Sequence, residues 1–136
     1  MAASALVDAG FLVALLSRRD ANHRWATEQA SCFPPPWMTC EAALSETFHL
    51  LGGRGSRSVA SLLRRSALVC SYRFADDVDA VLRLLEKYSE VPMSFADACL
   101  VRMTEVVNDP TLLTTDADFR IYRRHGRRTI PCVLPR

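Results

Sequence analysis

The chain has 136 residues, of which 49% are hydrophobic and 24% are charged. These values are typical of one soluble globular domain, and they exclude a disordered, collagen-like or disulfide-rich protein. The formal net charge of +2 conceals an uneven distribution. Residues 1–118 carry 11 basic and 15 acidic side chains, whereas residues 119–136 carry 6 basic and no acidic ones. A basic end on an acidic body indicates two surfaces that serve different purposes.

The cysteines and the apolar runs predict a cytoplasmic protein without a membrane partner. No two cysteines form a CxxC pair, and each stands among apolar or small residues, which predicts buried, reduced thiols in a reducing compartment. They are Cys32, Cys40, Cys70, Cys99 and Cys132. The longest apolar run, over residues 9–16, is too short to span a bilayer. The first residues lack the basic region and cleavage site of an export signal.

Strands and helices are predicted to alternate along the whole chain. A short buried strand over residues 5–7 ends at Asp8, and a helix over residues 11–17 follows it. A helix capped by Asp20 and running through Ala30 comes next, and a strand at 37–39 follows it. Helices are then expected over 40–51 and 57–66, with a glycine-rich turn between them and Ser56 as the cap of the second. The rest of the chain is expected to form a strand over 67–72, helices over 75–88 and 94–107, a strand over 111–115, a helix over 118–124 and a strand over 129–134. This alternation predicts an α/β fold with a central parallel β-sheet flanked by α-helices, in a single domain over residues 1–136.

Four carboxylates fall where such a sheet binds its ligands. Asp8 and Asp116 each follow a predicted strand directly, Glu46 lies in the helix after the second strand, and Asp97 lies in the first turn of the helix that Ser94 begins. Ligands of open parallel sheets bind beyond the carboxyl ends of the strands. The sequence therefore predicts that these four side chains share one site.

Clustered carboxylates need a neutralising partner. Two unit charges about 5 Å apart repel by roughly 3 kcal/mol at an effective dielectric constant of about 20. Oxygen ligands without His or Cys suit Mg²⁺ or Mn²⁺ better than Zn²⁺. One or two such ions would activate a water molecule and hold a phosphodiester for in-line attack. The four carboxylates therefore predict metal-dependent phosphodiester hydrolysis without a protein nucleophile.

Four short segments, at residues 6–10, 44–46, 94–98 and 113–119, resemble in order the acidic motifs of PIN-domain ribonucleases, and most of all those of VapC-type toxins of toxin–antitoxin pairs. The resemblance implies a three-layer PIN-like fold, with Asp8, Glu46, Asp97 and Asp116 as catalytic metal ligands, Asp118 as an accessory acidic residue and Thr114 as the residue that orients Asp116. It also implies Mg²⁺- or Mn²⁺-dependent endonucleolytic cleavage of RNA, a homodimer and inhibition by a cognate antitoxin protein.

Some of these carboxylates also have purely structural interpretations. Ser94 and Asp97 match a capping box, in which both side chains satisfy amides at the start of a helix. Asp116 or Asp118 is equally suited to cap the helix expected after it. Glu46 could be a solvated helix residue, although its neighbours Leu44, Phe48 and Leu50 indicate a largely buried helix, which favours a site role.

Two other functions stay open at this point. Many members of the resembling family carry Thr or Ser after the first Asp, whereas this chain has Ala9, so an inactive or weak PIN-like module that binds RNA or a protein is an alternative. A receiver-like phosphoacceptor domain is disfavoured, because it would need a lysine near the last strand. The only lysine, Lys87, falls on a predicted helix.

The basic end of the chain has two interpretations. Arg120, Arg123, Arg124 and Arg127 follow the i, i+3, i+4, i+7 spacing of one helix face. They would form either an RNA-binding rim beside Asp116 or a solvated helix end whose cations suit the helix dipole.

Overall fold

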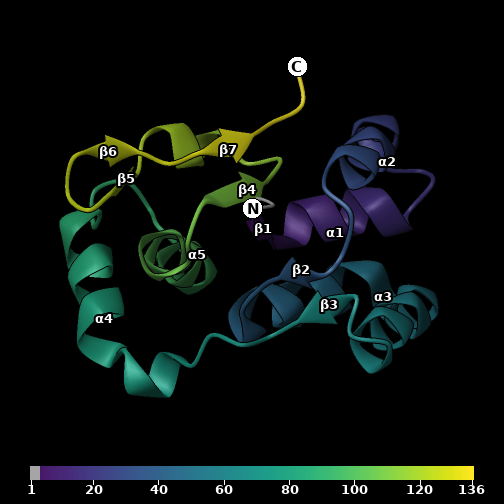
Figure 1. Cartoon of the computed structure of the whole chain (residues 1–136), viewed down its shortest axis with the longest axis horizontal. Coiled ribbons are helices and arrows are strands. Elements are labelled where there is room, and N and C mark those ends of the chain that lie inside the picture. The colour runs from purple at the N-terminus through teal and green to yellow at the C-terminus, as the bar shows by residue number, and fades with distance from the viewer. Residues whose placement is uncertain (1–3) are drawn as a thin grey trace.

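Five short strands form one fully parallel sheet at the centre of the molecule (Figure 1). The structure is a computed structural model that describes residues 4–136. The strands lie in the order β3-β2-β1-β4-β7. Their bounds are β1 Ser4–Val7, β2 Trp37–Met38, β3 Leu68–Val69, β4 Pro110–Leu113 and β7 Cys132–Val133. The predicted α/β class and parallel sheet are therefore confirmed.

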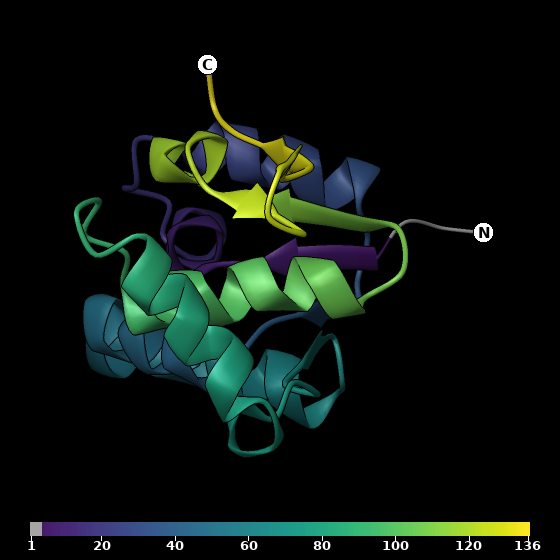
Figure 2. The same cartoon turned by 90° about the vertical axis from the view of Figure 1, so that its left-hand side faces the viewer.

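Helices cover both faces of the sheet and give the molecule three layers (Figures 1 and 2). They are α1 Ala9–Leu16, α2 His23–Cys32, α3 Glu41–Arg64, α4 Val78–Lys87 and α5 Phe95–Val106, with single 3₁₀ turns at Phe74–Asp76 (η1) and Ala117–Arg120 (η2). One core lies between the sheet, α4, α5 and the start of α3. The other lies between the sheet, α1, α2 and the second half of α3. Among the described residues, no helix is long and apolar enough to cross a membrane.

The alternation of side chains along a strand explains why two separate cores form. Leu6 and Leu112 are fully buried in the core with α5, whereas Val7 and Leu113, one position later on the same strands, are fully buried in the core with α1. Successive strand residues point to opposite faces of a sheet. A parallel sheet covered on both faces therefore needs continuous apolar strands, which is what residues 5–7 and 112–113 supply.

The two helices expected over residues 40–51 and 57–66 form one kinked helix, α3. Gly52 has φ +67° and ψ −165°, outside the helical region, and helical geometry resumes directly after it. Only glycine adopts such a conformation without steric cost. The expectation that Ser56 caps a separate helix is wrong, because the Ser56 hydroxyl donates a hydrogen bond to the carbonyl oxygen of Gly52 at 2.8 Å.

The prediction of a helix over residues 118–124 is wrong. The helix is replaced by the single turn η2 and then by a hairpin, in which β5 (Arg123–Arg124) pairs antiparallel with β6 (Arg128–Thr129). The physical reason is the turn between them, where His125 and Gly126 both adopt positive φ values, 51° and 79°, as tight hairpin turns require. The four arginines therefore do not share a helix face.

Other boundaries differ by a few residues. Asn22, not Asp20, is the cap residue of α2, and the Asp20 carboxylate accepts a hydrogen bond from the Asn22 amide at 2.8 Å. The strand expected over 67–72 is reduced to β3, and the helix expected over 75–88 begins as η1.

Candidate active site

A cleft of about 420 Å³ lies at the carboxyl ends of β1 and β4. All four predicted carboxylates line it, although they come from four separate segments of the chain. Asp8 follows β1, Asp116 follows β4, Glu46 lies on α3 and Asp97 lies on α5. The other polar side chain that lines the cleft is Thr115. The remaining lining residues are small or apolar: Ala9, Gly10, Ala43, Leu50, Ala96, Leu100 and Ala117.

Asp8 is the most buried of the four carboxylates, with 8% of its surface exposed. It caps α1, because its Oδ1 accepts a hydrogen bond from the Phe11 amide at 3.1 Å. Its Oδ2 accepts a hydrogen bond from the Thr114 hydroxyl. Burial raises the pKa of Asp8 to about 6, the two hydrogen bonds oppose that rise, and the charges of Asp116 and Asp97 add to it.

Thr114 joins two of the carboxylates through one buried hydroxyl. The hydroxyl that donates to Asp8 also accepts a hydrogen bond from the backbone amide of Asp116 at 3.0 Å. The Asp116 carboxylate in turn caps η2 by accepting from the Asp118 amide at 2.9 Å. Asp118 is half-buried in η2 and does not line the cleft.

Asp97 both takes part in a capping box and lines the cleft, so the two predicted positions of its side chain do not exclude each other. The capping box is present, since Ser94 Oγ accepts from the Asp97 amide at 3.0 Å and the Asp97 carboxylate accepts from the Ser94 amide at 3.4 Å. The carboxylate also lines the cleft, where it accepts a hydrogen bond from the Tyr122 hydroxyl at 3.0 Å. Burial raises the pKa of Asp97, and the nearby charge of Asp116 adds to the rise.

Tyr122 is a site residue that the sequence motifs do not indicate. Its ring is fully buried and packs edge-on against Tyr88 and Phe119, with ring centroids 5.1 and 5.3 Å away. This packing fixes the hydroxyl that holds Asp97. No local pattern links residues 97 and 122, because their contact depends on how α5 and η2 meet in the fold.

If Asp97 ligates the predicted metal, Tyr122→Phe should leave the fold intact and lower the predicted RNA cleavage by about tenfold, the lower end of the effect of removing a hydrogen bond that orients a metal ligand. The activity is measured as kcat/KM at fixed metal concentration. Tyr72→Phe is the matched control, since that hydroxyl donates to Asp77 at 2.7 Å, away from the cleft. An equal loss in both variants would contradict the role of Tyr122.

Glu46 and Leu50 are exposed and Leu44 and Phe48 are half-buried, so the expectation that this part of the helix is largely buried is wrong. Glu46 faces the cleft from α3, one helical turn before Leu50, which also lines the cleft and has 57% of its surface exposed. The side chain forms no hydrogen bond or salt bridge among the described residues, which leaves it free to turn toward a ligand in the cleft.

Gly10 is a second site residue that sequence reasoning missed. A Cβ atom at this position would lie 2.0 Å from Thr115 Oγ1 and 3.3 Å from Thr115 Cβ. The first turn of α1 therefore contacts the segment after β4 only because residue 10 has no side chain. This close contact keeps Asp8 and Asp116 on the same side of the cleft.

The chemistry of the cleft fits a hard divalent cation. Its charged groups are four carboxylates, without His or Cys, and Mg²⁺ and Mn²⁺ prefer such oxygen ligands. In the part of the chain that the structure describes, no three His, Cys, Asp or Glu side chains already stand in a metal-binding arrangement. Exposed Glu46 is the side chain with room to move, while hydrogen bonds hold Asp8 and Asp97 in place.

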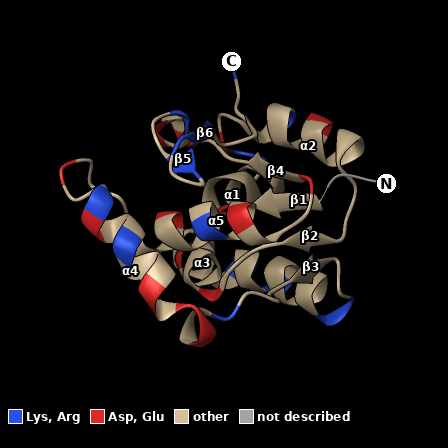
Figure 3. Ribbon diagram, turned by 60° about the vertical axis from the view of Figure 1, so that its left-hand side comes forward, with Lys and Arg blue, Asp and Glu red and all other residues tan. Residues whose placement is uncertain are grey.

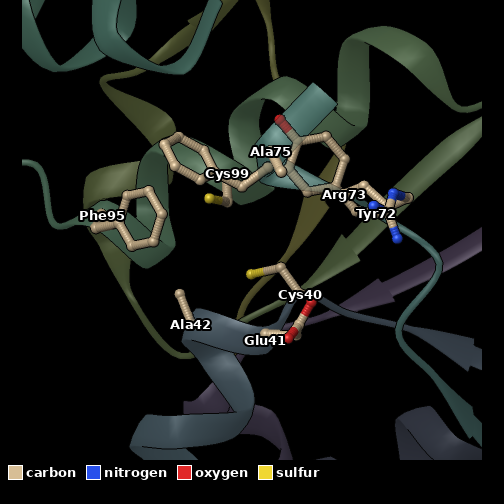
Figure 4. A pocket seen from close by; sticks show the side chains of 9 residues that line it. Cys40, Glu41, Ala42, Tyr72, Arg73, Ala75, Phe95 and Cys99 are labelled. Atoms are coloured by element: carbon tan, nitrogen blue, oxygen red, sulfur yellow. The ribbon is translucent and has the colours of Figure 1, made fainter. Parts of the chain in front are cut away.

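A second pocket, of about 330 Å³, lies between the start of α3 and α5 (Figure 4). It is lined by the buried thiols of Cys40 and Cys99 and by the edge-on pair of Phe74 and Phe95, whose ring centroids are 4.8 Å apart. It holds one carboxylate, Glu41, and lacks the charge cluster of the first cleft.

All five cysteines are free thiols, but only Cys40 and Cys99 are buried, so the expected burial is wrong for exposed Cys32.

The four predicted RNA-binding arginines differ in their contacts. Arg123 donates to the carbonyl oxygens of residues 120, 121 and 122, and Arg124 donates to that of Thr104. Both are half-buried, whereas Arg120 and Arg127 are exposed. The hairpin that carries three of them appears as a blue segment at β5 and β6 in Figure 3.

Residues 5–124 match the family model of the PIN domain, and the chain therefore belongs to the PIN-domain family. Among solved structures it is similar to the crystal structure of VapC20 of Mycobacterium tuberculosis, which is described as a sarcin-ricin loop cleaving toxin. The two share 26% sequence identity over 85% of this chain and 92% of that chain, with a TM-score of 0.76. No curated protein matches the chain.

Proposed function

We propose that this protein is a Mg²⁺- or Mn²⁺-dependent endoribonuclease and the toxin of a toxin–antitoxin pair. The observation that carries the proposal is the convergence of Asp8, Glu46, Asp97 and Asp116 on one cleft at the carboxyl ends of β1 and β4. Membership of the PIN family and the likeness to VapC20, a toxin that cleaves the sarcin-ricin loop, support RNA as the substrate.

The four carboxylates would hold one or two ions. When bound, the metal supplies an activated water and charge stabilisation for in-line attack on phosphorus. The chain itself supplies orientation. Thr114 fixes Asp8 and the backbone of Asp116, and Tyr122 fixes Asp97. Asp118, whose amide donates to Asp116, acts as an accessory residue beside the cleft.

The proposed reaction uses no protein nucleophile, because the carboxylates of the cleft, which could themselves attack phosphorus, are assigned to the metal. Thr115 is the only hydroxyl residue that lines the cleft, and neither His nor Lys stands there to activate a nucleophile. Water is therefore the attacking group in the proposed reaction, and the products are the two ends of a hydrolysed phosphodiester.

Three further properties stay predictions from the family resemblance. They are a homodimeric assembly, inhibition by a cognate antitoxin and a cytoplasmic location. Of the four arginines near the chain end, exposed Arg120 and Arg127 are free to contact RNA directly, whereas Arg123 and Arg124 would contribute by holding the hairpin.

A PIN-like module that binds RNA without cleaving it is the second candidate function. Ala9 favours it, because this residue lines the cleft and contributes no hydroxyl to it. Four mutually repelling carboxylates argue against it, since repulsion on that scale lowers stability unless a cation offsets it.

Cleavage of purified ribosomal RNA with Mg²⁺, with Mn²⁺ and with excess EDTA tests the proposal directly. We expect fragments in either metal and none with EDTA. Intact RNA in all three reactions, with RNA binding retained, would favour the module that does not cleave.

We also expect Mn²⁺ to raise the thermal unfolding midpoint of the protein, because an ion that binds only the folded state stabilises it by mass action. The gain is about 2.7 kcal/mol at a hundredfold excess over Kd. Differential scanning fluorimetry over a Mn²⁺ series measures it, with Ca²⁺-free buffer and EDTA as the baseline. A midpoint that does not change with Mn²⁺ would count against a metal site.

A further inference from the structure

The second half of α3 carries an unbalanced positive charge that the cleft does not explain. Residues 47–75 contain five arginines and no acidic residue. Four of the five, Arg54, Arg57, Arg64 and Arg65, belong to the part of α3 after the kink at Gly52 or to its C-cap, and all four are exposed. The predicted RNA-binding surface at residues 120–127 does not include them.

Helical spacing gathers most of these residues on one face. Arg54, Arg57, Ser58, Ser61 and Arg65 follow an i, i+3, i+4, i+7, i+11 pattern, which places them in one stripe along the helix. A groove of about 380 Å³ runs beside this stripe, between α3 and the end of α1. Its lining consists of Leu16, Arg57, Ser58, Ser61, Leu62 and Arg65. The charged groups of the groove are therefore all cationic, and serine hydroxyls stand between them.

The arginines of this stripe have no acidic partners. Among the described residues none of them forms a salt bridge, whereas some exposed arginines elsewhere do. Arg83 pairs with Asp79 at 2.7 Å, and Arg73 pairs with Asp76 at 2.8 Å. The alternating charges of α4 are visible as red and blue bands in Figure 3. The groove on α3 thus presents guanidinium groups whose hydrogen-bond donors are free for a ligand.

Helix electrostatics explains only some of these positions. Cations stabilise the last turn of a helix and destabilise the first. Arg64 and Arg65 end α3 and suit that rule. Arg54 and Arg57 break it, because they stand within the first residues after Gly52, where the second half of the helix begins. A favourable helix dipole therefore cannot account for the stripe.

The groove lies close to the cleft. Leu16, which lines the groove, ends α1, and Asp8 caps the beginning of that eight-residue helix. At 1.5 Å per residue the helix is about 12 Å long. On α3, Arg54 comes four residues after Leu50, which lines the cleft. A polyanion held in the cleft would therefore reach the groove within a short length of chain.

We propose that this groove binds the phosphate backbone of the RNA substrate, with Arg54, Arg57 and Arg65 as the cationic contacts and Ser58 and Ser61 as hydroxyl donors. Arginine, serine and backbone donors are the groups that contact phosphates in protein–nucleic acid complexes. The identity of the ligand rests on the proposed function, while the anion-binding character rests on the charge and geometry of the groove itself.

Binding of a fluorescein-labelled single-stranded RNA, measured by anisotropy in EDTA over a series of salt concentrations, tests the proposal without cleavage. The triple variant Arg54→Gln, Arg57→Gln, Arg65→Gln should bind at least tenfold more weakly at low salt. Its slope of log affinity against log salt should fall by about 2, since each lost phosphate contact on a single strand contributes about 0.7.

Two controls separate a specific groove from general charge. Replacing the same three arginines with lysine should retain most of the slope, because the charges stay. The double variant Arg24→Gln, Arg83→Gln removes two arginines that pair with acids elsewhere, Glu28 and Asp79, and should bind as the unchanged protein does. Thermal unfolding of each variant confirms that it is folded.

A triple glutamine variant with unchanged RNA affinity and an unchanged salt slope would overturn the proposal. An acidic protein partner would then be the better candidate ligand for this face of α3. Failure of the unchanged protein to bind RNA would overturn it as well. If the unchanged protein binds RNA through this groove but does not cleave it with Mg²⁺ or Mn²⁺, only the proposed nuclease function fails. If it cleaves RNA while the triple variant binds normally, only the groove proposal fails.

Discussion

Replacing Asp8 with asparagine is expected to abolish RNA cleavage and, in the absence of metal, to make the protein more stable. The variant keeps one oxygen that can accept from the Phe11 amide. It places an amide donor where the other oxygen accepts from the Thr114 hydroxyl, and it removes the buried charge that would hold the metal. A loss of about 4 kcal/mol in transition-state stabilisation lowers a rate about 1000-fold. Cleavage of ribosomal RNA under single-turnover conditions measures this loss.

The stability gain follows from the direction of the pKa shift. The folded protein raises the pKa of Asp8 from 3.8 to about 6, so folding favours the protonated form. The metal-free protein should therefore lose stability as the pH rises from about 4 to about 6 and remain less stable above that range. A rise of about two pKa units corresponds to about 3 kcal/mol. At pH 7 the asparagine variant should recover much of this amount in urea unfolding.

Asp20→Asn is the matched control. Its carboxylate accepts a hydrogen bond from the Asn22 amide but does not line the cleft, so cleavage should not change. An Asp8→Asn protein that cleaves at the original rate would contradict the metal mechanism. A variant less stable than the original protein at pH 7 would contradict the expected gain, and it would mean that the lost Thr114 hydrogen bond outweighs the relief of the buried charge.

Gly10→Ala is expected to damage both the fold and the reaction. The new methyl group would meet Thr115 Oγ1 at 2.0 Å, so Thr115 must turn away or the first turn of α1 must shift. Overpacking of this kind costs about 1–3 kcal/mol. Because both residues line the cleft, a displacement of about 1 Å should also lower cleavage about a hundredfold. Urea unfolding and single-turnover cleavage measure the two effects.

Gly53→Ala provides the control, since a Cβ atom there meets nothing within 4 Å. That change should raise stability by up to about 1 kcal/mol, because alanine is the better helix former. Thr115→Ala combined with Gly10→Ala should restore much of the lost stability, which a double-mutant cycle would report as coupling. Additive effects of the two changes would show that the contact does not determine the cost.

The regular parts of the molecule could be predicted because local patterns determine them. The apolar strands around Leu6 and Leu112 predict a sheet covered on both faces, and Ser94 with Asp97 predicts the start of α5 at the observed residue. The positions of Asp8 and Asp116 after parallel strands bring them to the same edge of the sheet. Chain order and periodicity were sufficient for these features.

The missed features depend on contacts between distant residues or on unusual backbone angles. Tyr122 reaches Asp97 only through the packing of η2 against α5, and Gly10 matters only because Thr115 lies beside it. The hairpin at the end of the chain depends on His125 with positive φ, a conformation that is uncommon outside glycine and asparagine. The helical spacing of the arginines around it was therefore misleading.

The kink at Gly52 has a consequence for where the molecule tolerates change. The part of α3 before it packs through Ala43 into one core and through Leu44, Phe48 and Leu51 against the other, and the part after it packs through Val59 and Leu62 into that second core. Gly52 and Gly53 are exposed, and a Cβ atom added to either would meet nothing within 4 Å. A fluorophore or a short insertion placed at this pair would therefore disturb neither core, and it would stand between the half of α3 that bears Glu46 and the half that bears Arg57.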